Sequence, residues 1–280
     1  MNKTSVIFLL LALLLFNNEK INAQHKNNLE AGLFNIGFGG FIGGLGAILN
    51  KKPNEKTGKF FFRGFSQGAL GGFLLFESKN LVGKYGKTGN YSYIWPSKLI
   101  NSAGVSIIEN AASNRSFGER WHLNIGFNRL EIFTKNKFKI SYRIMPFALS
   151  STIYGFTQGH LSINESIKTG TFIFTTNRIA SEGLTVSNTI FLLNNRIFSK
   201  QLILSHELVH TYQFESFSSL NPYLDKPINN LNVNKDWLKK YSKIFYTDFN
   251  FLTFGILYEL NTNNSSNFFE REAQFYTEKQ

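Results

Sequence analysis

Two histidines and a glutamate within five consecutive residues are the side chains whose types and spacing suggest chemistry: His206-Glu207-Leu208-Val209-His210. In a helix, residues four positions apart lie on one face, so both imidazoles can reach a single metal ion. Imidazole nitrogens bind zinc readily, and a catalytic zinc site keeps one position for water. A glutamate beside the histidines can take a proton from that water. The spacing therefore predicts that His206 and His210 bind zinc and that Glu207 is a general base.

A helix is expected around this motif. Ser199 is a residue type that caps helix starts, and neither Gly nor Pro occurs in residues 199–217. Leu204 and Leu208 fall on a side away from the two histidines, so one face can pack while the other carries the metal. The alternative is a helix with two surface histidines, but the apolar residues 202–204 directly before the motif argue against it.

Two histidines do not complete a zinc site, so a third ligand is expected elsewhere. Gln213 and Ser216 stand where the extended motif of the metzincins has Gly and His, which excludes that family. Near the C-terminus the chain reads Asn-Phe-Phe-Glu-Arg-Glu-Ala-Gln-Phe-Tyr over residues 267–276. The two segments together resemble the gluzincin metallopeptidases, in which a Glu-x-x-Ala-Asp helix supplies the third ligand. The resemblance covers only these two short helices and implies Glu270 as the third zinc ligand.

The choice between two neighbouring glutamates follows from helix geometry. Glu270 and Glu272 are about 200° apart around a helix, so both cannot face one metal. Glu270 shares its face with Ala273 and Gln274, whereas Glu272 is expected mostly outward. Gln274 stands where the family has Asp, so we expect it to contact a ligand histidine without contributing a charge. Glu270 is the preferred ligand; Glu272, Glu259 or an aspartate are the alternatives.

The first residues predict export. Lys3 precedes an apolar run at residues 6–16, and Ala23 is a small residue suited to cleavage before Gln24. We therefore expect residues 1–23 to be a signal peptide and the protein to be periplasmic, envelope-associated or secreted. An uncleaved anchor is the alternative. The chain has no Cys, which excludes a lipoprotein and fits a bacterial envelope better than a disulfide-rich secreted scaffold.

Residues 24–280 are expected to form a single metallopeptidase-like domain of the α+β class. Residues 24–115 would be a glycine-rich helical part, and residues 116–280 a mostly antiparallel sheet followed by zincin-like helices that bind zinc. The formal net charge is +12, but the basic residues are spread out and no run exceeds two. That pattern argues against a nucleic-acid partner.

Two glycine-rich segments are expected to form a helical hairpin. Residues 31–49 carry no charge and include seven Gly. Glycines recur four residues apart, as Gly39 and Gly43 in the first segment and Gly64 and Gly68 in the second, which allows helix backbones to approach closely. In one interpretation the two helices pack against each other and the catalytic part. In the other, residues 31–76 contact or enter a membrane.

A third helix is expected over residues 96–112. Glu109 and Asn110 near its end are interpreted as solvated or capping residues. Two further histidines, His122 and His160, lie in the region that follows, and each is interpreted as a packed or surface residue rather than a metal ligand.

Alternation with a period of two begins near Trp121. Phe138, Ile140 and Tyr142 fall on one face of a segment whose other face carries charged and polar residues, which predicts a half-buried strand. Further strands are expected at residues 121–127, 130–132, 146–154, 170–176 and 188–193. The resemblance implies that residues 188–193 form an edge strand that holds an extended substrate.

The last part of the chain is expected to cover the site. Residues 221–234 are rich in Asn and Pro and predict a loop, followed by helices at 236–245 and 249–260. Tyr258 and Tyr276 are candidates to polarise a substrate carbonyl.

The sequence thus predicts a zinc-dependent peptidase that acts on peptide or protein substrates in the bacterial envelope or outside the cell. The alternative is a non-catalytic structural or membrane-associated envelope protein that retains a metal-binding helix. The intact Glu207 favours the enzyme, whereas an aromatic content of 16% and the glycine-rich hairpin favour the alternative.

Overall fold

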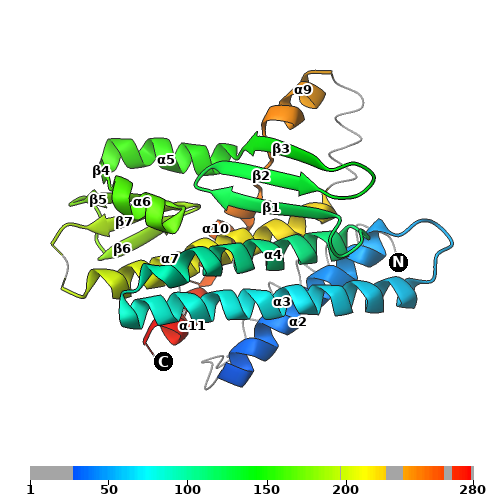
Figure 1. Cartoon of the computed structure of the whole chain (residues 1–280), viewed down its shortest axis with the longest axis horizontal. Coiled ribbons are helices and arrows are strands. Elements are labelled where there is room, and N and C mark those ends of the chain that lie inside the picture. Colours follow the sequence, from blue (N-terminus) through cyan, green and yellow to red (C-terminus); the bar gives the residue numbers. More distant parts are fainter. Residues whose placement is uncertain (1–27, 196, 225–235, 262–266, 279–280) are drawn as a thin grey trace.

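The computed structural model describes residues 28–195, 197–224, 236–261 and 267–278 (Figure 1). The expected signal peptide, residues 1–23, lies outside this part of the chain, as does most of the expected loop over the site. The fold is α+β, as predicted. Its helices are α2 (Asn28–Asn50), α3 (Thr57–Thr88), α4 (Ile94–Ala112), α5 (Pro146–Gln158), α6 (Ile163–Thr169), α7 (Lys200–Ser216), α9 (Asp236–Ile244), α10 (Asn250–Asn261) and α11 (Phe268–Glu278), with short 3-10 helices η1 (Tyr91–Tyr93) and η2 (Phe217–Tyr223). Its strands are β1 (Arg120–Ile125), β2 (Asn128–Phe133), β3 (Lys139–Ile144), β4 (His160–Leu161), β5 (Phe172–Thr176), β6 (Gly183–Val186) and β7 (Thr189–Leu193).

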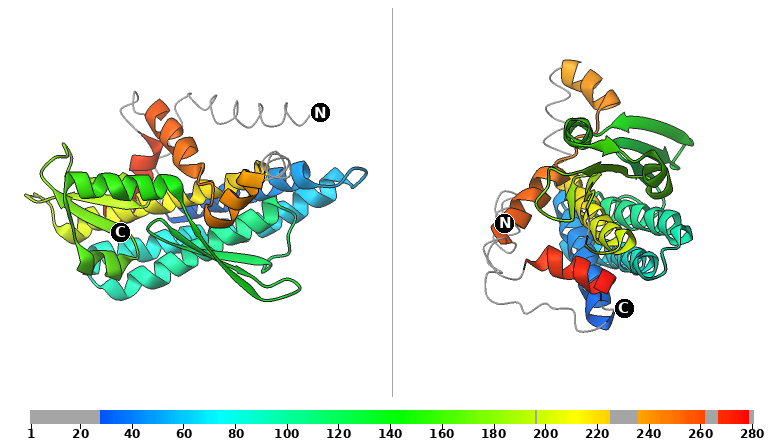
Figure 2. Two further views of the ribbon diagram at one scale, coloured as in Figure 1. Left: turned by 90° about the horizontal axis from the view of Figure 1, so that it is seen from above. Right: turned by 90° about the vertical axis from the view of Figure 1, so that its left-hand side faces the viewer.

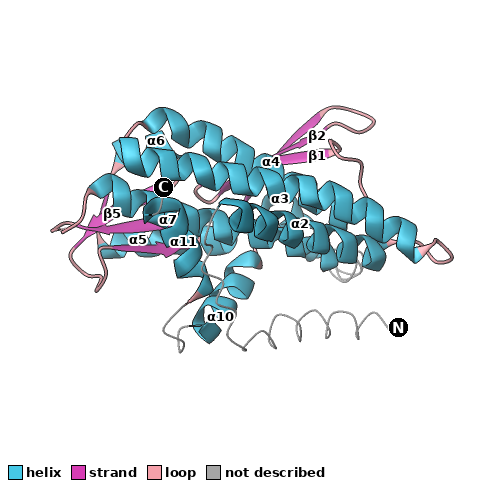
Figure 3. Ribbon diagram, turned by 90° about the horizontal axis from the view of Figure 1, so that it is seen from below, coloured by secondary structure: helices cyan, strands magenta, loops and turns pink. Residues whose placement is uncertain are grey.

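The glycine-rich hairpin is a closely packed pair of helices, α2 and α3, with α4 and α7 packed against α3 (Figure 3). A Cβ atom added to Gly64 would lie 2.5 Å from the carbonyl oxygen of Gly43 and 2.7 Å from the Cβ of Ala47. The absence of side chains on facing glycines is what lets the two backbones meet. The interpretation of the hairpin as two packed helices is therefore confirmed.

Helix α2 also has the composition of a membrane-spanning segment. Among the helices in the described ranges, α2 alone is long and apolar enough to cross a membrane, although more than half of its most apolar stretch is buried inside the protein. A core helix and a signal sequence meet the same criterion, so membrane contact through residues 31–76 stays a prediction.

The strands form two separate sheets rather than one. The first has the order β1-β2-β3 and is antiparallel throughout; the second has the order β4-β5-β7-β6, in which β5 and β7 are parallel. Figure 1 shows the second sheet beneath α5, with which it is in contact, and the first sheet beyond one end of α5, above α4. The prediction of a strand at residues 146–154 was wrong, because Pro146 occupies the first turn of α5 and the buried residues Ala148, Thr152 and Gly155 recur at helical spacing.

The first sheet covers α4 with its polar face, not its apolar one. Arg129 is fully buried between two carboxylates: its Nη2 lies 3.1 Å from Oε2 of Glu109 on α4, and its Nε lies 3.0 Å from Oε1 of Glu131. The guanidinium also stacks on the ring of Tyr246, 3.9 Å from its centroid. The interpretation of Glu109 as a solvated or capping residue was wrong. Asn110 is buried as well, and its amide donates to the carbonyl oxygens of Phe117 and Arg120.

Alanine at Gly64 should destabilise the fold. The added methyl must displace the backbone of α2, and overpacking of this kind costs about 1–3 kcal/mol. Gly37 is a matched control, because a Cβ added there meets nothing within 4 Å. Gly37→Ala should therefore raise the free energy of unfolding by about 1 kcal/mol through helix propensity. Urea denaturation of both variants measures the difference, and equal midpoints would contradict the close helix contact.

The buried ion pairs should make stability depend on acid pH. Burial raises the pKa of the Glu109 carboxyl, but Arg129, His122 and Arg120 together outweigh burial and lower the pKa to about 2. Because the folded pKa lies below the ordinary value of 4.5, the stabilisation is complete above about pH 4.5 and is lost as the pH falls toward 2. Glu109→Gln should lower the free energy of unfolding at pH 7 by about 3–5 kcal/mol.

The difference in the free energy of unfolding between Glu109→Gln and the native protein should become smaller as the pH falls from 4.5 to 2. Glu119, which pairs with the exposed Lys135 at 2.9 Å, is the control, and Glu119→Gln should cost at most about 1 kcal/mol. Urea titrations at several pH values test this, and a constant difference across that pH range would show that Glu109 is not held as an anion.

Candidate metal centre

Helix α7, which carries both histidines, runs through the middle of the molecule (Figure 1). Ser199 precedes α7 with extended backbone, as a helix-start residue should, but its side chain makes no capping hydrogen bond. Leu204, Leu208 and Val209 of α7 are buried in the main hydrophobic core, which also includes Ile190 and Leu192 of β7. The strongly apolar residues of α7 thus anchor it, while His206 stays partly exposed at the surface.

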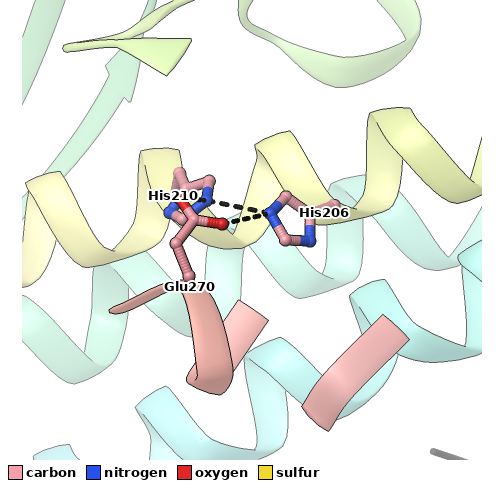
Figure 4. A group of neighbouring side chains, drawn as sticks. All are labelled: His206, His210 and Glu270. Atoms are coloured by element: carbon pink, nitrogen blue, oxygen red, sulfur yellow. Dashed lines mark hydrogen bonds and ion pairs between the residues drawn. The ribbon is translucent and has the colours of Figure 1, made fainter. Parts of the chain in front are cut away.

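Three side chains from two helices meet at one point (Figure 4). Nε2 of His206 lies 3.1 Å from Nε2 of His210 and 3.1 Å from Oε2 of Glu270, and Nε2 of His210 lies 3.3 Å from Oε1 of Glu270. Ligand atoms about 2.0–2.1 Å from a tetrahedral zinc ion lie about 3.3–3.4 Å from each other. The donor types and their separations therefore fit one zinc ion. Glu270 reaches the histidines from the first turn of α11, and its side chain is 34% exposed, which leaves the site open on one side.

Charge balance within the cluster agrees with metal-ligand chemistry. Burial raises the pKa of the Glu270 carboxyl, but its hydrogen bonds with His206 and His210 outweigh burial and hold the pKa far below its usual range. Burial lowers the pKa of His210, but the hydrogen bond with Glu270 and the charge of Glu207 raise it overall. Glu270 is therefore an anion ready to bind a cation, and a metal would displace the proton that His210 shares with it.

Gln213 orients His210. Nδ1 of His210 lies 2.8 Å from Oε1 of Gln213, and Nε2 of Gln213 donates to the carbonyl oxygen of Phe269 at 3.0 Å and to Oε2 of Glu272 at 2.9 Å. Because the nitrogen of the Gln213 amide donates to both of these acceptors, the amide is oriented with its oxygen toward the imidazole of His210. Neutral His210 consequently carries its proton on Nδ1, so that Nε2 can bind a metal once the proton shared with Glu270 is displaced.

The role expected of Gln274 belongs to Gln213. Gln274 is exposed. The spacing contained a usable signal, because Gln213 lies three residues after His210 and so on the same face of the same helix. In the sequence, Gln213 indicates only that the chain lacks the metzincin motif, so its contact with His210 was not predicted.

Glu272 does not point outward, as predicted, but is buried against the glycine-rich hairpin. Its Oε1 lies 2.6 Å from Nζ of Lys79 on α3, which also donates to Asn35 of α2 at 3.0 Å. Both Lys79 and Glu272 are almost fully buried. The prediction failed because α11 is covered on two sides, by α7 and by α3. Of the two glutamates, the structure brings Glu270 to the histidines.

The other candidate residues are placed as follows. The hydroxyl of Tyr258 on α10 hydrogen-bonds Oε1 of Glu270, and its ring packs edge-on against His210. Tyr276 is fully buried and hydrogen-bonds Asn35, away from the cluster. His122 is buried beside Ser106, and His160 is exposed, so neither joins the three ligands.

Glu207 lies against the edge of the second sheet. The hydroxyl of Thr185 in β6 donates to Oε2 of Glu207 at 2.7 Å and to its carbonyl oxygen at 3.0 Å. A Cβ added to Gly183 would lie 2.5 Å from Oε1 of Glu207, so glycine is what lets the strand lie over the carboxylate. The prediction that residues 188–193 form the edge strand was wrong, because β7 is paired on both sides and β6 is the edge.

Removing the Gln213 amide should weaken metal binding. Gln213→Ala frees the imidazole of His210 to rotate and to change tautomer, and loss of such a partner typically costs 10–100-fold in affinity, so we expect a rise of roughly that size in the zinc dissociation constant. Gln274→Ala is the matched control on the exposed side of α11 and should leave the constant unchanged. Competition with a zinc-binding dye measures both, and equal constants would refute the assignment of Gln213.

Comparison with known proteins identifies no relative. No family model, no curated protein and no solved structure matches this chain. The side chains of the site are therefore the evidence that bears on function.

Proposed function

We propose that this chain is a zinc-dependent metallopeptidase. The observation that carries the proposal is the meeting of His206, His210 and Glu270 at separations of 3.1–3.3 Å, next to Glu207 on the same helix. Nε2 of each histidine and the carboxylate of Glu270 would hold the ion. When bound, zinc would acidify a water molecule and polarise the carbonyl of a peptide bond.

Glu207 is the general base of the proposed mechanism. One of its carboxylate oxygens, Oε2, accepts the hydroxyl hydrogen of Thr185. The carboxylate takes a proton from the attacking water and later gives it to the nitrogen of the leaving amine. Thr185 acts through Glu207 as a positioning residue, because it holds the carboxylate at β6 and restricts its rotation.

Tyr258 and Gln213 hold the metal ligands in place. The Tyr258 hydroxyl binds one oxygen of Glu270, and the Gln213 amide binds Nδ1 of His210. Each contact restricts the rotation of a ligand side chain, so the three donor atoms stay close together. Such preorganisation supports affinity because less side-chain freedom is lost on binding.

The free edge of β6 is the proposed place for an extended substrate. No strand in the described ranges pairs with β6 on the side away from β7. Peptides bind such edges by adding a strand, and this edge runs beside the Glu207 carboxylate. A zincin-like arrangement, in which an edge strand borders the metal helix, is therefore part of the proposal. Export, indicated by residues 1–23, would place the substrate in the envelope or outside the cell.

A non-catalytic membrane-associated protein is the second candidate. It is favoured by α2, whose length and apolarity would suit a membrane, and by large exposed apolar side chains such as Phe62 on α3. Such a protein would keep the metal without hydrolysis, so the two candidates differ in one measurable property.

Glu207→Gln separates metal binding from hydrolysis. The variant keeps all three proposed ligands, so it should retain about one zinc per chain. Because an amide cannot take the proton, peptide hydrolysis should fall by about 100-fold or more. Zinc content by mass spectrometry and cleavage of a mixed peptide library provide the two measurements.

Two further variants complete the test. Glu270→Ala should lose the zinc as well as the hydrolysis, whereas Glu259→Gln, which alters an exposed residue of α10, should affect neither. A native protein that binds zinc and cleaves no peptide would support the non-catalytic candidate. Loss of zinc in Glu207→Gln would contradict the role of Glu207.

A further inference from the structure

The outer face of the first sheet is apolar, and several of its side chains are exposed. The strand register brings Trp121, Ile132 and Ile140 into one row across β1, β2 and β3. The next row on the same face is Leu123, Leu130 and Tyr142. Ile140 is 59% exposed, Tyr142 50% and Leu130 37%.

This sheet buries its polar face and exposes its apolar face, the opposite of an ordinary half-buried sheet. An antiparallel sheet usually turns its apolar face to the core and its polar face to water. Here the buried face carries His122, Arg129 and Glu131, and the ion pairs with Glu109 hold that face against α4. Single exposed apolar residues are normal, but a contiguous apolar face indicates a surface that another molecule covers.

The tip of the sheet is cationic. The hairpin between β2 and β3 carries Lys135, Lys137 and Lys139, with Phe138 among them at 71% exposure. Residues 118–144 contain two acidic residues, of which Glu119 pairs with Lys135 and Glu131 is buried. Exposed positive charge at the hairpin tip is thus left without an equal exposed negative charge.

Helix α9, beside β3, also combines exposed apolar side chains with lysines. It packs beside that strand, joined to it by the bridge between Ile144 and Phe245 (Figure 1; other views in Figure 2). Trp237, Tyr241 and Ile244 recur along one side of α9, and Trp237 is 63% exposed. The other side carries Lys239 and Lys243, and Lys240 lies at the border between the two sides. A short helix with an aromatic apolar side and a lysine-rich side is typical of membrane surfaces.

We propose that the outer face of β1–β3, together with α9, binds the surface of a membrane that contains anionic lipids. The apolar rows and Phe138 would enter the interface between headgroups and acyl chains, and the lysines of the hairpin and of α9 would contact lipid phosphates. Exposed Trp and Tyr side chains suit that interface because each has an apolar body and a polar atom. A second copy of the chain is a poorer occupant, because it brings the same cationic residues to the contact.

Vesicle binding tests the surface. The protein is isolated as the cell makes it, and its sedimentation with phosphatidylglycerol vesicles is compared with that on phosphatidylcholine vesicles. We expect binding to the anionic vesicles that weakens with added salt. Replacing Lys135, Lys137 and Lys139 together by Ser should weaken it roughly 100-fold. Ile140→Ser should also weaken it, whereas Ile163→Ser, at a similarly exposed isoleucine on α6, should not.

Tryptophan fluorescence locates the contact independently of the N-terminal residues, because the three Trp of the chain are Trp95, Trp121 and Trp237. Brominated lipids quench tryptophans that enter the bilayer. Trp121→Phe and Trp237→Phe should each remove part of the quenching, and Trp95→Phe should remove none. Trp95 lies at the start of α4, where its indole donates to Ile167 of α6.

Three outcomes would overturn the proposal. In the first, the sheet face makes no contact with lipid: either Trp95→Phe is the variant that loses the quenching, or Ile140→Ser binds vesicles as tightly as the native protein. In the second, Phe62→Ser in α3 weakens binding and Ile140→Ser does not, which would assign the membrane contact to the glycine-rich hairpin. In the third, Ile140→Ser converts a dimer to a monomer without affecting vesicle binding, which would make the sheet face an interface between copies.

Discussion

Lys79 and Glu272 form a buried ion pair at 2.6 Å, and the position of helix α11 depends on it. Removing two charges from water is costly unless further hydrogen bonds complete their surroundings. Asn35 and Gln213 supply those bonds, from α2 and α7 respectively. The pair therefore connects three helices to α11, and Glu270, two residues before Glu272, reaches the histidines as a consequence.

The glycine contacts and the candidate metal centre are parts of one arrangement. Lys79 can reach Glu272 beside Asn35 because α2 and α3 lie close enough for their backbones to touch. The same Glu272 then holds the Gln213 amide, which in turn orients His210. Helices α2 and α3, near the N-terminus, and α11, near the C-terminus, thereby determine the geometry around His210. The motif that contains His210 lies on a different helix, α7.

Local patterns predicted the local features well. The spacing of His206, Glu207 and His210 predicts both the helix and its shared face, because those depend on residues in one turn. Glycine spacing predicts the close contact between α2 and α3 for the same reason. Burial of Glu109 and Glu272 could not be predicted in this way, because their partners Arg129 and Lys79 are distant in sequence and are brought near only by the fold. The orientation of the first sheet could not be predicted either, because alternation shows that two faces differ but not which one meets α4.

The neutral amide of Gln213 has a consequence for the net charge of the centre. Two neutral imidazoles and one carboxylate together carry −1, so a divalent cation would leave the centre at +1. A carboxylate in place of Gln213 would bring that sum to zero, and the charge of Glu272 behind the amide is already balanced by Lys79. A centre with residual positive charge withdraws more electron density from a bound oxygen. In the proposed zinc site, the amide would therefore make the ion a stronger electrophile and bind it less tightly than a carboxylate at the same position would.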